Sequence, residues 1–593
     1  MSEDSTGQRW MRPAARWNFP NDRSETLNSL LNALKLQRLT AAVLTNRGFD
    51  NPLLAREFLS PQLNSLHDPF LLRDMDRAVE RLQTAIRQRE SILLYGDYDV
   101  DGTASIVVLK KAIEILGGIA DFHIPHRLRD GYGMRSEVIE RAAETGVRLI
   151  VSVDTGIRAR AVVAHARELG IDVIVTDHHL PEAELPAALA VLNPSRPDCN
   201  YPNKHLCGAG VTFKLVQALF VRSGMPTSRQ AALLDSFLKP VAIATVADIV
   251  PLLDENRVLV RRGLSGLRNV RNIGLRALLA VAGFDQGECP TAHQVAFRIA
   301  PRINAAGRMA TARDVVEVFL TGDPERAREL AEQLDTLNRE RQRTESEIVD
   351  AILAQCEQCE FDFAARAMVF AGNAWHLGVL GIVASRLVER FNRPVFVLSD
   401  ASPDSDAEAS CLSGSGRSIP GFHLLDALEA MPELFQKFGG HRQAAGLTLR
   451  ADQLDSFRQR FAAYASERIS EEDLRPVFSI DAEASFPELT DSCVEQLMSL
   501  GPFGFGNAAP LFLSRECEVA GPAKALKDDK HFNVPLRQNG RLLFCKAWNF
   551  GDRAEYFTPG GKLDVLFQLE DDPTGRKRGY GSWSISVKDV RRC

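Results

Sequence analysis

Three closely spaced aspartates follow a short apolar run near residue 95, and this stretch constrains the fold more than any other. Residues 92–95 read Ile-Leu-Leu-Tyr, which is typical of a buried strand, and Asp97, Asp99 and Asp101 come next. An apolar pattern of helical period follows from 104 to 116. Carboxylates crowded at the end of a buried strand raise one another's pKa unless a cation neutralises them. Aspartate oxygens suit Mg²⁺ or Mn²⁺, so the stretch indicates either a metal site or a solvated turn that caps the helix.

The length and composition indicate a multidomain globular protein. A chain of 593 residues predicts about three or four domains. Its apolar runs are too short and interrupted to span a bilayer, and residues 1–23 contain no apolar signal segment. The ten cysteines are scattered, and the Cys356 and Cys359 pair has no second pair to complete a zinc site. We therefore expect a cytoplasmic protein with reduced thiols and no membrane partner.

Strand and helix patterns alternate between residues 75 and 200. The expected strands are 91–95, 119–124, 148–153, 171–176 and 189–192, and the expected helices are 103–116, 135–145 and 157–169. This alternation predicts a parallel sheet with helices on both faces. Ligands bind such sheets beyond the carboxyl ends of the strands.

Polar residues follow the carboxyl ends of these strands. Asp154 follows strand 148–153, and Asp177, His178 and His179 follow strand 171–176. Asp248 ends an apolar segment, 240–247, that reads as a buried helix. An isolated Asp-His-His can be an ordinary hydrogen-bonded loop. Several carboxylates with one or two imidazoles are, however, the set of ligands that two neighbouring divalent cations need.

These stretches resemble the motifs of a known superfamily. Asp-Tyr-Asp-Val-Asp-Gly (97–102), Val-Asp-Thr-Gly (153–156), Asp-His-His (177–179) and Val-Ala-Asp (246–248) are similar to the four motifs of the DHH phosphoesterases. The similarity is greatest to the bacterial RecJ single-stranded-DNA exonucleases, from about residue 75 onward.

The resemblance implies two divalent metal ions, Mn²⁺ or Mg²⁺, and a set of ligands. The implied metal ligands are Asp99, Asp101, Asp154, His178 and Asp248, with Asp97 and His179 in or beside the ligand set, His179 also as a catalytic residue, and Asp177 as an orienting group. Members that act on small substrates have a histidine where this chain has Tyr95. Whether Asp97 takes the place of that histidine is open.

Two further segments carry groups suited to a nucleic-acid strand. Residues 125–134 include Arg127, Arg129 and Tyr132, and residues 300–308 include Arg302, Asn304 and Arg308. Arginine and an aromatic ring in glycine-rich loops suit phosphate contact and base stacking. We expect both segments to be loops, either facing the substrate, as the resemblance implies, or simply lying on the surface.

A long helix is expected after these motifs. Asp323 and Pro324 form a typical helix start, and a sparse apolar stripe continues to about 358. So narrow a stripe predicts a connector between domains, with Arg339, Arg341 and Arg343 solvated.

A second α/β unit follows the connector. It contains expected strands 367–370 and 395–398 and a helix 378–391, with Ser413–Ser418 and Gly439–His441 as candidate ligand-binding loops. These segments resemble a DHHA1 domain. The resemblance implies that Ser415 and Arg417 hold the 5′-terminal phosphate, that Gly440 lets the backbone approach a ligand, and that His441 supports the scissile phosphate. Each segment taken alone could be a turn.

The C-terminal region reads as all-β. Short alternating runs at 511–513, 517–520, 532–537, 541–549, 562–569 and 580–588 are separated by turn residues. Residues 524–593 hold fourteen Lys or Arg and nine Asp or Glu, whereas the whole chain has a net charge of −6. Lysines and arginines interleave with Phe532, Phe544, Trp548 and Trp583. An OB-type barrel with a basic, aromatic face would bind single strands; the alternative is that the aromatics belong to the barrel core.

The expected fold class is therefore α/β multidomain. The expected parts are a helical segment (1–74), a parallel-sheet DHH domain (75–322), a connecting helix (323–360), a second α/β DHHA1 domain (361–468) and an OB-type barrel (469–593). The resemblance implies a 5′-to-3′ exonuclease that releases 5′-mononucleotides from single-stranded DNA in repair and recombination. Its implied partners are a helicase and a single-strand-binding protein, and we expect a monomer. The alternatives are a phosphodiesterase of short oligonucleotides or cyclic dinucleotides and a non-catalytic strand-binding scaffold.

Overall fold

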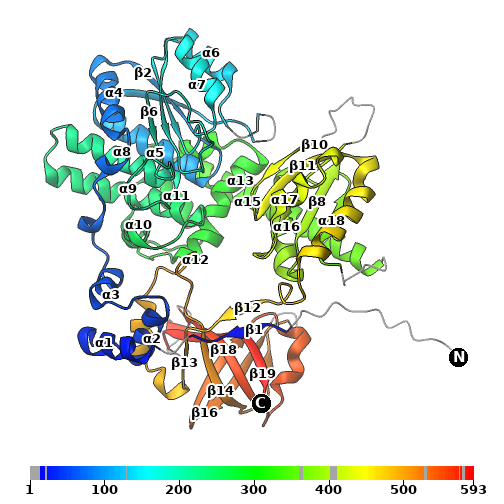
Figure 1. Cartoon of the computed structure of the whole chain (residues 1–593). Coiled ribbons are helices and arrows are strands. Elements are labelled where there is room, and N and C mark those ends of the chain that lie inside the picture. Colours follow the sequence, from blue (N-terminus) through cyan, green and yellow to red (C-terminus); the bar gives the residue numbers. More distant parts are fainter. Residues whose placement is uncertain are drawn as a thin grey trace. The chain divides into compact units, whose positions relative to one another are not determined.

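The computed structural model describes most of the chain (Figure 1). The described residues are 14–20, 23–127, 130–131, 133–358, 365–400, 411–526, 530–572, 575–576 and 581–593. They belong to two compact units. The larger unit comprises Phe19–Asp335 and Ser479–Cys593, and the smaller comprises Met1–Asn18 and Thr336–Phe478. The division falls within a helix.

A parallel five-stranded sheet forms the centre of the first part of the larger unit. Its order is β3-β2-β4-β5-β6, with β2 at Ser91–Tyr95, β3 at Ile119–His123, β4 at Leu149–Val153, β5 at Asp172–Thr176 and β6 at Ala190–Leu192. The crossover helices are α5 at Val100–Ile115, α6 at Ser136–Glu144 and α7 at Arg160–Glu168. All five expected strands and three expected helices are confirmed. Every residue of β4 is buried, because helices cover both faces of the sheet.

Helices complete this part of the unit. They are α4 at Met75–Gln88, α8 at Gly208–Arg222, α9 at Thr227–Ala247, α10 at Asp254–Gly266, α11 at Ile273–Val281, α12 at Ala292–Gln294, α13 at Ala300–Met309 and α14 at Arg313–Leu320, with η1 at Leu63–Ser65, η2 at Pro69–Leu71, η3 at Leu267–Asn269 and η4 at Val295–Ile299. By length and composition α9 could cross a membrane, but half of its most apolar window is buried inside the protein, as in a core helix. Segment 300–308 is helical, so the expected loop there is wrong.

The expected long helix is α15 at Pro324–Gln358. Arg341 is not solvated as expected. Its guanidinium is buried and donates to Glu345 Oε2 at 2.8 Å and to Asn338 Oδ1 at 2.9 Å. Arg343 is exposed and pairs with Glu347.

The smaller unit contains a mixed five-stranded sheet of order β10-β11-β9-β8-β7. Its strands are β7 at Met368–Gly372, β8 at Val395–Asp400, β9 at Cys411–Arg417, β10 at Phe435–Gly440 and β11 at Ala444–Arg450, and its helices are α16 at Leu377–Phe391, α17 at Leu424–Glu429, α18 at Leu454–Arg468, η5 at Pro432–Leu434 and η6 at Ala451–Gln453. A further pair of strands, β1 at Arg16–Asn18 and β12 at Val477–Ser479, forms a two-stranded sheet. Segment 413–417 is therefore a strand rather than the expected loop, and Gly439 and Gly440 end another strand.

The C-terminal part of the larger unit is a closed barrel. Strands β14 (Phe512–Val519), β18 (Lys562–Asp571), β19 (Trp583–Arg592), β17 (Arg541–Ala547) and β16 (Phe532–Gln538) pair in this order, and β14 also pairs with β16. The short strands β13 (Ala482–Glu483) and β15 (Lys524–Ala525), together with α19 (Asp491–Met498), η7 (Phe486–Glu488) and η9 (Gly551–Phe557), complete it. The expected α/β multidomain class with an OB-type barrel is confirmed.

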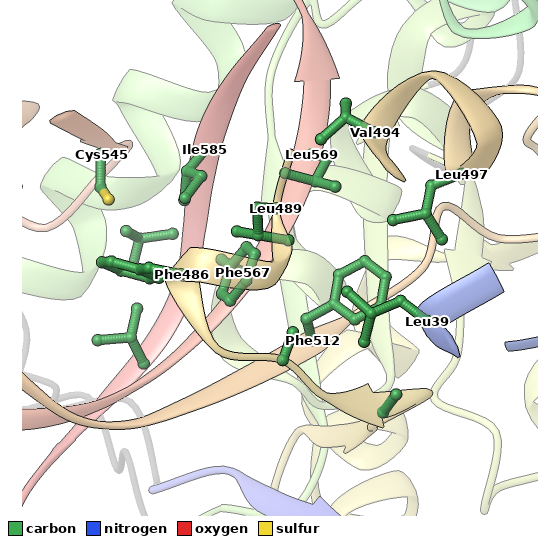
Figure 2. Close-up of a cluster of buried hydrophobic side chains, with 14 of the residues drawn as sticks. Leu39, Phe486, Leu489, Val494, Leu497, Phe512, Cys545, Phe567, Leu569 and Ile585 are labelled. Atoms are coloured by element: carbon green, nitrogen blue, oxygen red, sulfur yellow. The ribbon is translucent and has the colours of Figure 1, made fainter. Parts of the chain in front are cut away.

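The N-terminal helices belong to the core of this barrel domain. They are α1 at Ser24–Leu34, α2 at Arg38–Asn46 and α3 at Pro52–Leu59, coloured blue against the orange and red barrel strands (Figure 1). Leu39 of α2 is in the same buried cluster as Leu497 and Phe512 (Figure 2). Helices α1 to α3 thus pack with the barrel domain, more than 400 residues farther along the chain. The domain boundaries expected from the sequence stay a prediction.

Candidate metal centre and strand-binding surfaces

Six expected ligands lie together at the carboxyl end of the parallel sheet. Ligand atoms of Asp97, Asp99 and Asp154 lie within 4.8 Å of one another, and so do those of a second group. The second group consists of Asp101, His178 and Asp248. Asp154, a member of the first group, also forms a third group with His178 and His179, and its Oδ1 lies 3.2 Å from His178 Nε2. Overlapping groups linked by Asp154 and His178 suit a two-metal site.

Helix N-termini hold two of these carboxylates in place. Asp99 is the N-cap of α5, and its Oδ1 accepts hydrogen bonds from the amides of Asp101 and Gly102 at 2.9 and 3.0 Å. Asp101 in turn accepts from the amides of Gly208 and Ala209, which begin α8, at 2.5 and 2.8 Å. The positive ends of two helices therefore face the acidic cluster.

The Cys-Gly-Ala-Gly start of α8 is a part of the site that our sequence reasoning missed. A β-carbon at Gly208 would lie 2.6 Å from Asp154 Oδ1. Small residues immediately before an apolar helix were the available signal, because such a start lets backbone amides approach an anion. Asp154 itself has a φ of 60°, a backbone conformation that non-glycine residues adopt at functional sites when their surroundings enforce it.

Burial and mutual repulsion disfavour charge on the carboxyls of the cluster. Burial, followed by the charge of Asp99, raises the pKa of Asp97 to about 8. Burial together with neighbouring aspartates also raises the pKa of Asp99, of Asp154 and of Asp248. The pKa of His178 is lowered by burial. Neutral imidazole is the form that binds a metal.

The side chains present fit a pair of divalent cations. Within the part of the chain that the structure describes, neither Asp97 Oδ1 nor Asp248 Oδ2 has a hydrogen-bond partner, although both atoms are buried. A buried carboxylate oxygen without a donor is costly unless a cation binds it. Aspartate oxygens and one imidazole suit Mn²⁺ or Mg²⁺.

Asp177 orients the two histidines. Its Oδ1 accepts from the amides of His178 and His179 at 2.7 and 3.1 Å and lies 2.7 Å from His179 Nδ1. Its Oδ2 accepts from the Ile157 amide at 3.0 Å. Burial alone would raise the pKa of Asp177, but the hydrogen bond and charge of His179 outweigh it, and the pKa is lowered. Burial lowers the pKa of His179, but the hydrogen bond and charge of Asp177 together with the charges of Asp101 and Asp99 outweigh burial, and the pKa is raised.

Two tyrosines of the first motif take different positions. The Tyr95 hydroxyl donates to the Gly133 carbonyl at 3.3 Å, and its ring lies 5.0 Å from that of His123. Tyr98, which the sequence reasoning passed over, lies under the Arg127 guanidinium at 4.9 Å. Arg127 is thus placed beside the acidic cluster, whereas Arg129 and Tyr132 lie outside the described residues.

The three expected contacts on α13 have separate environments. Arg302 pairs with Asp335, with its Nε at 2.9 Å from Oδ1. Asn304 Oδ1 accepts from the Val100 amide at 3.1 Å, so this side chain supports the start of α5. Burial raises the pKa of the Tyr98 hydroxyl. The positive charge of Arg308 lies close enough to that hydroxyl to lower the same pKa, although by less. Arg308 is thus placed beside the first motif, as a strand contact would have to be.

In the smaller unit, the expected end-binding residues share one end of the sheet. Ser415 pairs with Gly446, and Arg417 pairs with Ala444, across β9 and β11. Gly440 pairs with Ala445, and the His441 amide donates to the Ala444 carbonyl at 2.8 Å. Because side chains alternate along a strand, Ser415 and Arg417 project from the same face of β9. β-carbons added at Gly414 and Gly416 would lie against residues of the neighbouring strand β8.

Only some of the barrel aromatics lie on its surface. Phe544 is 62% exposed and Trp548 is 43% exposed. Phe532 packs near Phe557 in the core, and the Trp583 indole donates to Asp491 at 2.8 Å. These aromatics therefore divide between the barrel surface and its core, and the binding of a strand by the exposed ones stays a prediction. On the pair β16–β17, Phe544 lies opposite Pro535, and Leu542 lies opposite Arg537.

Three family models match the chain. They are the DHH family N-terminal domain over residues 91–245, the DHHA1 domain over 363–467 and the RecJ OB domain over 480–580. Each matched range lies inside the longer range that the sequence predicted for that domain, and the outer boundaries stay a prediction.

Similar proteins and structures extend over most of the chain. The single-stranded-DNA-specific exonuclease RecJ of Bacillus subtilis is 37% identical over 93% of this chain and 68% of its own length. The protein of that name from Escherichia coli is 41% identical over 74% of this chain and 78% of its own length. The crystal structure of RecJ in complex with Mn²⁺ from Thermus thermophilus matches with a TM-score of 0.82 and 30% identity, over 98% of this chain and 80% of that one. A Mg²⁺ complex from the same organism matches with a TM-score of 0.77. The chain therefore belongs to the RecJ family of single-stranded-DNA-specific exonucleases.

Proposed function

We propose that this protein is a metal-dependent exonuclease that removes 5′-mononucleotides from the 5′ end of single-stranded DNA. The observation that carries the proposal is the set of overlapping ligand groups linked by Asp154 and His178. A clustered acidic and imidazole set in a chain of this family supports hydrolysis rather than a strand-binding scaffold, since unpaired buried carboxylates would only destabilise such a scaffold.

The six clustered residues would hold two divalent ions. Asp97, Asp99, Asp101, Asp154, His178 and Asp248 are the proposed ligands. When bound, such ions lower the pKa of a water molecule and stabilise charge on a leaving oxygen. Asp99 and Asp101 are oriented by backbone amides, and Asp177 keeps His179 beside the cluster. His179, whose pKa is raised, is suited to hold a proton beside the phosphate that is cleaved.

The strand would be recognised by groups outside the ligand set. Arg127 and Arg308 are the proposed phosphate contacts near the first motif, with Tyr98 as a surface for a base. We propose Arg129 and Tyr132 as further contacts from the sequence alone. Arg302 and Asn304 are better assigned to support, because Asp335 and the Val100 amide engage them.

The smaller unit would hold the end of the strand. Ser415 and Arg417 are the proposed contacts to a 5′-phosphate, since a hydroxyl and a guanidinium on one strand face suit that group. Gly440 and His441 are the proposed contacts to the phosphate that is cleaved. Gly439 has no neighbour within 4 Å of a would-be β-carbon, which leaves its backbone open to a ligand.

The barrel would hold the strand farther from its end. Phe544 and Trp548 are exposed rings on which bases can stack. A platform of this size has no purpose for a dinucleotide, so a phosphodiesterase of short substrates is the less suitable alternative. We further propose a cytoplasmic monomer that receives single strands from a helicase and a single-strand-binding protein.

The experiment compares the protein with its Asp154→Ala variant on single strands labelled at either end. Release of mononucleotides from the 5′ end with Mn²⁺, and none with EDTA or with the variant, is expected. Release from the 3′ end would refute the roles of Ser415 and Arg417. Strand binding without cleavage under either metal would refute the enzymatic proposal.

A further inference from the structure

A loop of the barrel domain contacts the turn that carries one of the proposed metal ligands. We call residues 499–507 the junction loop and residues 248–252 the metal turn, because the turn begins at Asp248. The Leu252 amide donates to the Phe505 carbonyl at 2.8 Å. A β-carbon at Gly506, where φ is +73°, would lie 2.9 Å from Pro251 Cβ and 3.1 Å from its Cα. The two segments are therefore in close backbone contact although some 250 residues separate them.

The junction loop has a fixed shape of its own. The Asn507 amide group donates to the carbonyls of Leu500 and Pro502 at 3.0 and 2.9 Å. Arg47, which directly follows α2, donates to Asn507 Oδ1 at 2.7 Å. Asn507 is almost fully buried. A buried amide with all these partners holds the loop in one conformation.

Residues of α10 anchor both segments. The Arg257 guanidinium, itself buried, donates to the Gly501 carbonyl at 2.9 Å. The Asn256 amide group donates to the Pro251 carbonyl at 3.0 Å and to the His205 carbonyl at 2.5 Å. The metal turn is thus held from one side by α10 and from the other by the junction loop.

The metal turn needs such support because its backbone is in an unfavourable conformation. Ile249, which directly follows Asp248, has a φ of 58° and is 68% exposed. A β-branched residue rarely adopts positive φ, and it persists there only when neighbouring contacts enforce it. Its own exposed side chain provides little of that enforcement. The hydrogen bonds at Pro251 and Leu252 supply it instead.

We propose that the junction loop is a positioning element of the metal centre, which holds Asp248 in the geometry that binds metal. The barrel domain then has two tasks: its exposed face binds the strand, and its junction loop completes the metal site of the parallel-sheet domain. This inference rests on the proposed role of Asp248 as a ligand, but it does not depend on the polarity or products of the reaction.

The test measures Mn²⁺ binding by Gly506→Ala without DNA, using the electron paramagnetic resonance signal of unbound Mn²⁺. The added methyl group forces the junction loop away from Pro251, and we expect Mn²⁺ affinity to fall about tenfold, as for other residues that support metal ligands. The matched control is Gly224→Ala, which has the same φ of +73°, but among the described residues its new β-carbon meets nothing within 4 Å beyond its own chain neighbours. It introduces equal backbone strain and should bind Mn²⁺ like the natural protein.

A second variant keeps the test decisive if Gly506→Ala does not fold. Asn507→Ala removes the bonds that shape the junction loop and adds no clash, and it should also weaken Mn²⁺ binding. Its control is Arg38→Ala, which loses another link between α2 and the barrel domain, the Glu488 pair at 2.6 Å, without touching the junction loop. In both loop variants kcat should recover at saturating Mn²⁺, and the KM for DNA should stay unchanged.

The outcomes separate this inference from the proposed function. A folded Gly506→Ala or Asn507→Ala protein that binds Mn²⁺ as tightly as the natural protein overturns the positioning role. Equal losses of Mn²⁺ affinity in the loop variants and in Arg38→Ala also overturn the positioning role, because equal losses would reflect general destabilisation. If the natural protein binds Mn²⁺ but does not cleave DNA, the proposed function fails while the positioning role is still decided by the binding data.

Discussion

Gly208 lies directly against Asp154, so that a β-carbon at position 208 would be 2.6 Å from the carboxylate oxygen Oδ1. The same glycine donates its amide to Asp101. One residue without a side chain thereby serves two of the proposed ligands, from the start of a helix that carries no acidic group in its first turn. Backbone at this position is part of the proposed metal centre.

We therefore expect Gly208→Ala to abolish most metal-dependent activity. The methyl group displaces Asp154 or α8, and a displacement of about 1 Å in a catalytic group can cost about a hundredfold in rate. Steady-state cleavage of single-stranded DNA with Mn²⁺ measures the effect. Gly210→Ala is the control, since the nearest described atom to its β-carbon would belong to the flexible Leu206 side chain, at 3.2 Å. Full activity in Gly208→Ala would contradict the tight fit.

The stability of the metal-free protein should fall as the pH rises. Burial and Asp99 raise the pKa of Asp97 to about 8, above its ordinary value of 3.8. The contribution of the protonated carboxyl to stability is therefore complete below about pH 4 and is lost as the pH rises through about 8. Saturating Mn²⁺ should reverse this trend, because it binds the ionised form.

Thermal unfolding in EDTA and in Mn²⁺, from pH 5 to pH 8.5, checks this expectation. The difference in Tm between the two conditions should increase with pH. Asp97→Asn cannot ionise, so its metal-free Tm should fall less over the same range. A constant difference in Tm for the natural protein would show that the acidic cluster does not couple metal binding to protonation.

Asp177→Asn should destabilise the fold as well as the site. The carboxylate accepts hydrogen bonds from two amides and one imidazole on Oδ1 and from a third amide on Oδ2. An asparagine cannot accept all of them, and loss of buried bonds to a charged group costs about 1.5–3 kcal/mol each. Urea unfolding in EDTA should show a loss of about 2–4 kcal/mol. Asp172→Asn is the control: the Asp172 carboxylate, which pairs with Arg81, is itself half-exposed, and its loss should cost less, about 1 kcal/mol.

Phe544→Ala should weaken binding of single strands. Base stacking on an exposed ring contributes about 1–3 kcal/mol, so the dissociation constant for a strand of about 20 nucleotides should increase about fivefold or more. Fluorescence anisotropy in EDTA measures binding without cleavage. Leu542→Ala removes a half-exposed aliphatic side chain of the same strand and is the control. Equal effects of both substitutions would indicate an apolar contact rather than stacking.

Arg417→Ala should reduce the preference for a phosphorylated 5′ end. A guanidinium bound to phosphate is lost, and kcat/KM should fall on 5′-phosphorylated strands and much less on strands with a 5′-hydroxyl. Arg450→Ala is the control, because Arg450 lies at the other end of the same sheet and pairs with Asp452. An equal loss of kcat/KM on both substrates would show that Arg417 does not act through the 5′-phosphate.

Several features of the protein were determined by the sequence itself. Alternation of apolar strands and amphipathic helices is local, because it follows from the 2.0 and 3.6 periods of the backbone, and it predicted all five strands of the parallel sheet. Strand direction then required that Asp97, Asp154 and His178 meet at one edge. The acidic cluster could therefore be predicted from the order of the residues alone.

Contacts between distant segments were decided only by the tertiary structure. Arg302, Asn304 and Arg308 were expected on a loop, but they lie on helix α13, where Arg302 pairs with Asp335 and Asn304 accepts from the Val100 amide that begins α5. Arg341 looked solvated because its neighbours are charged, yet it is buried with Glu345. The first helices gave no sign of a partner, and their leucines share the barrel core. Which apolar or polar groups meet across hundreds of residues depends on packing complementarity, and no local period of the sequence encodes it.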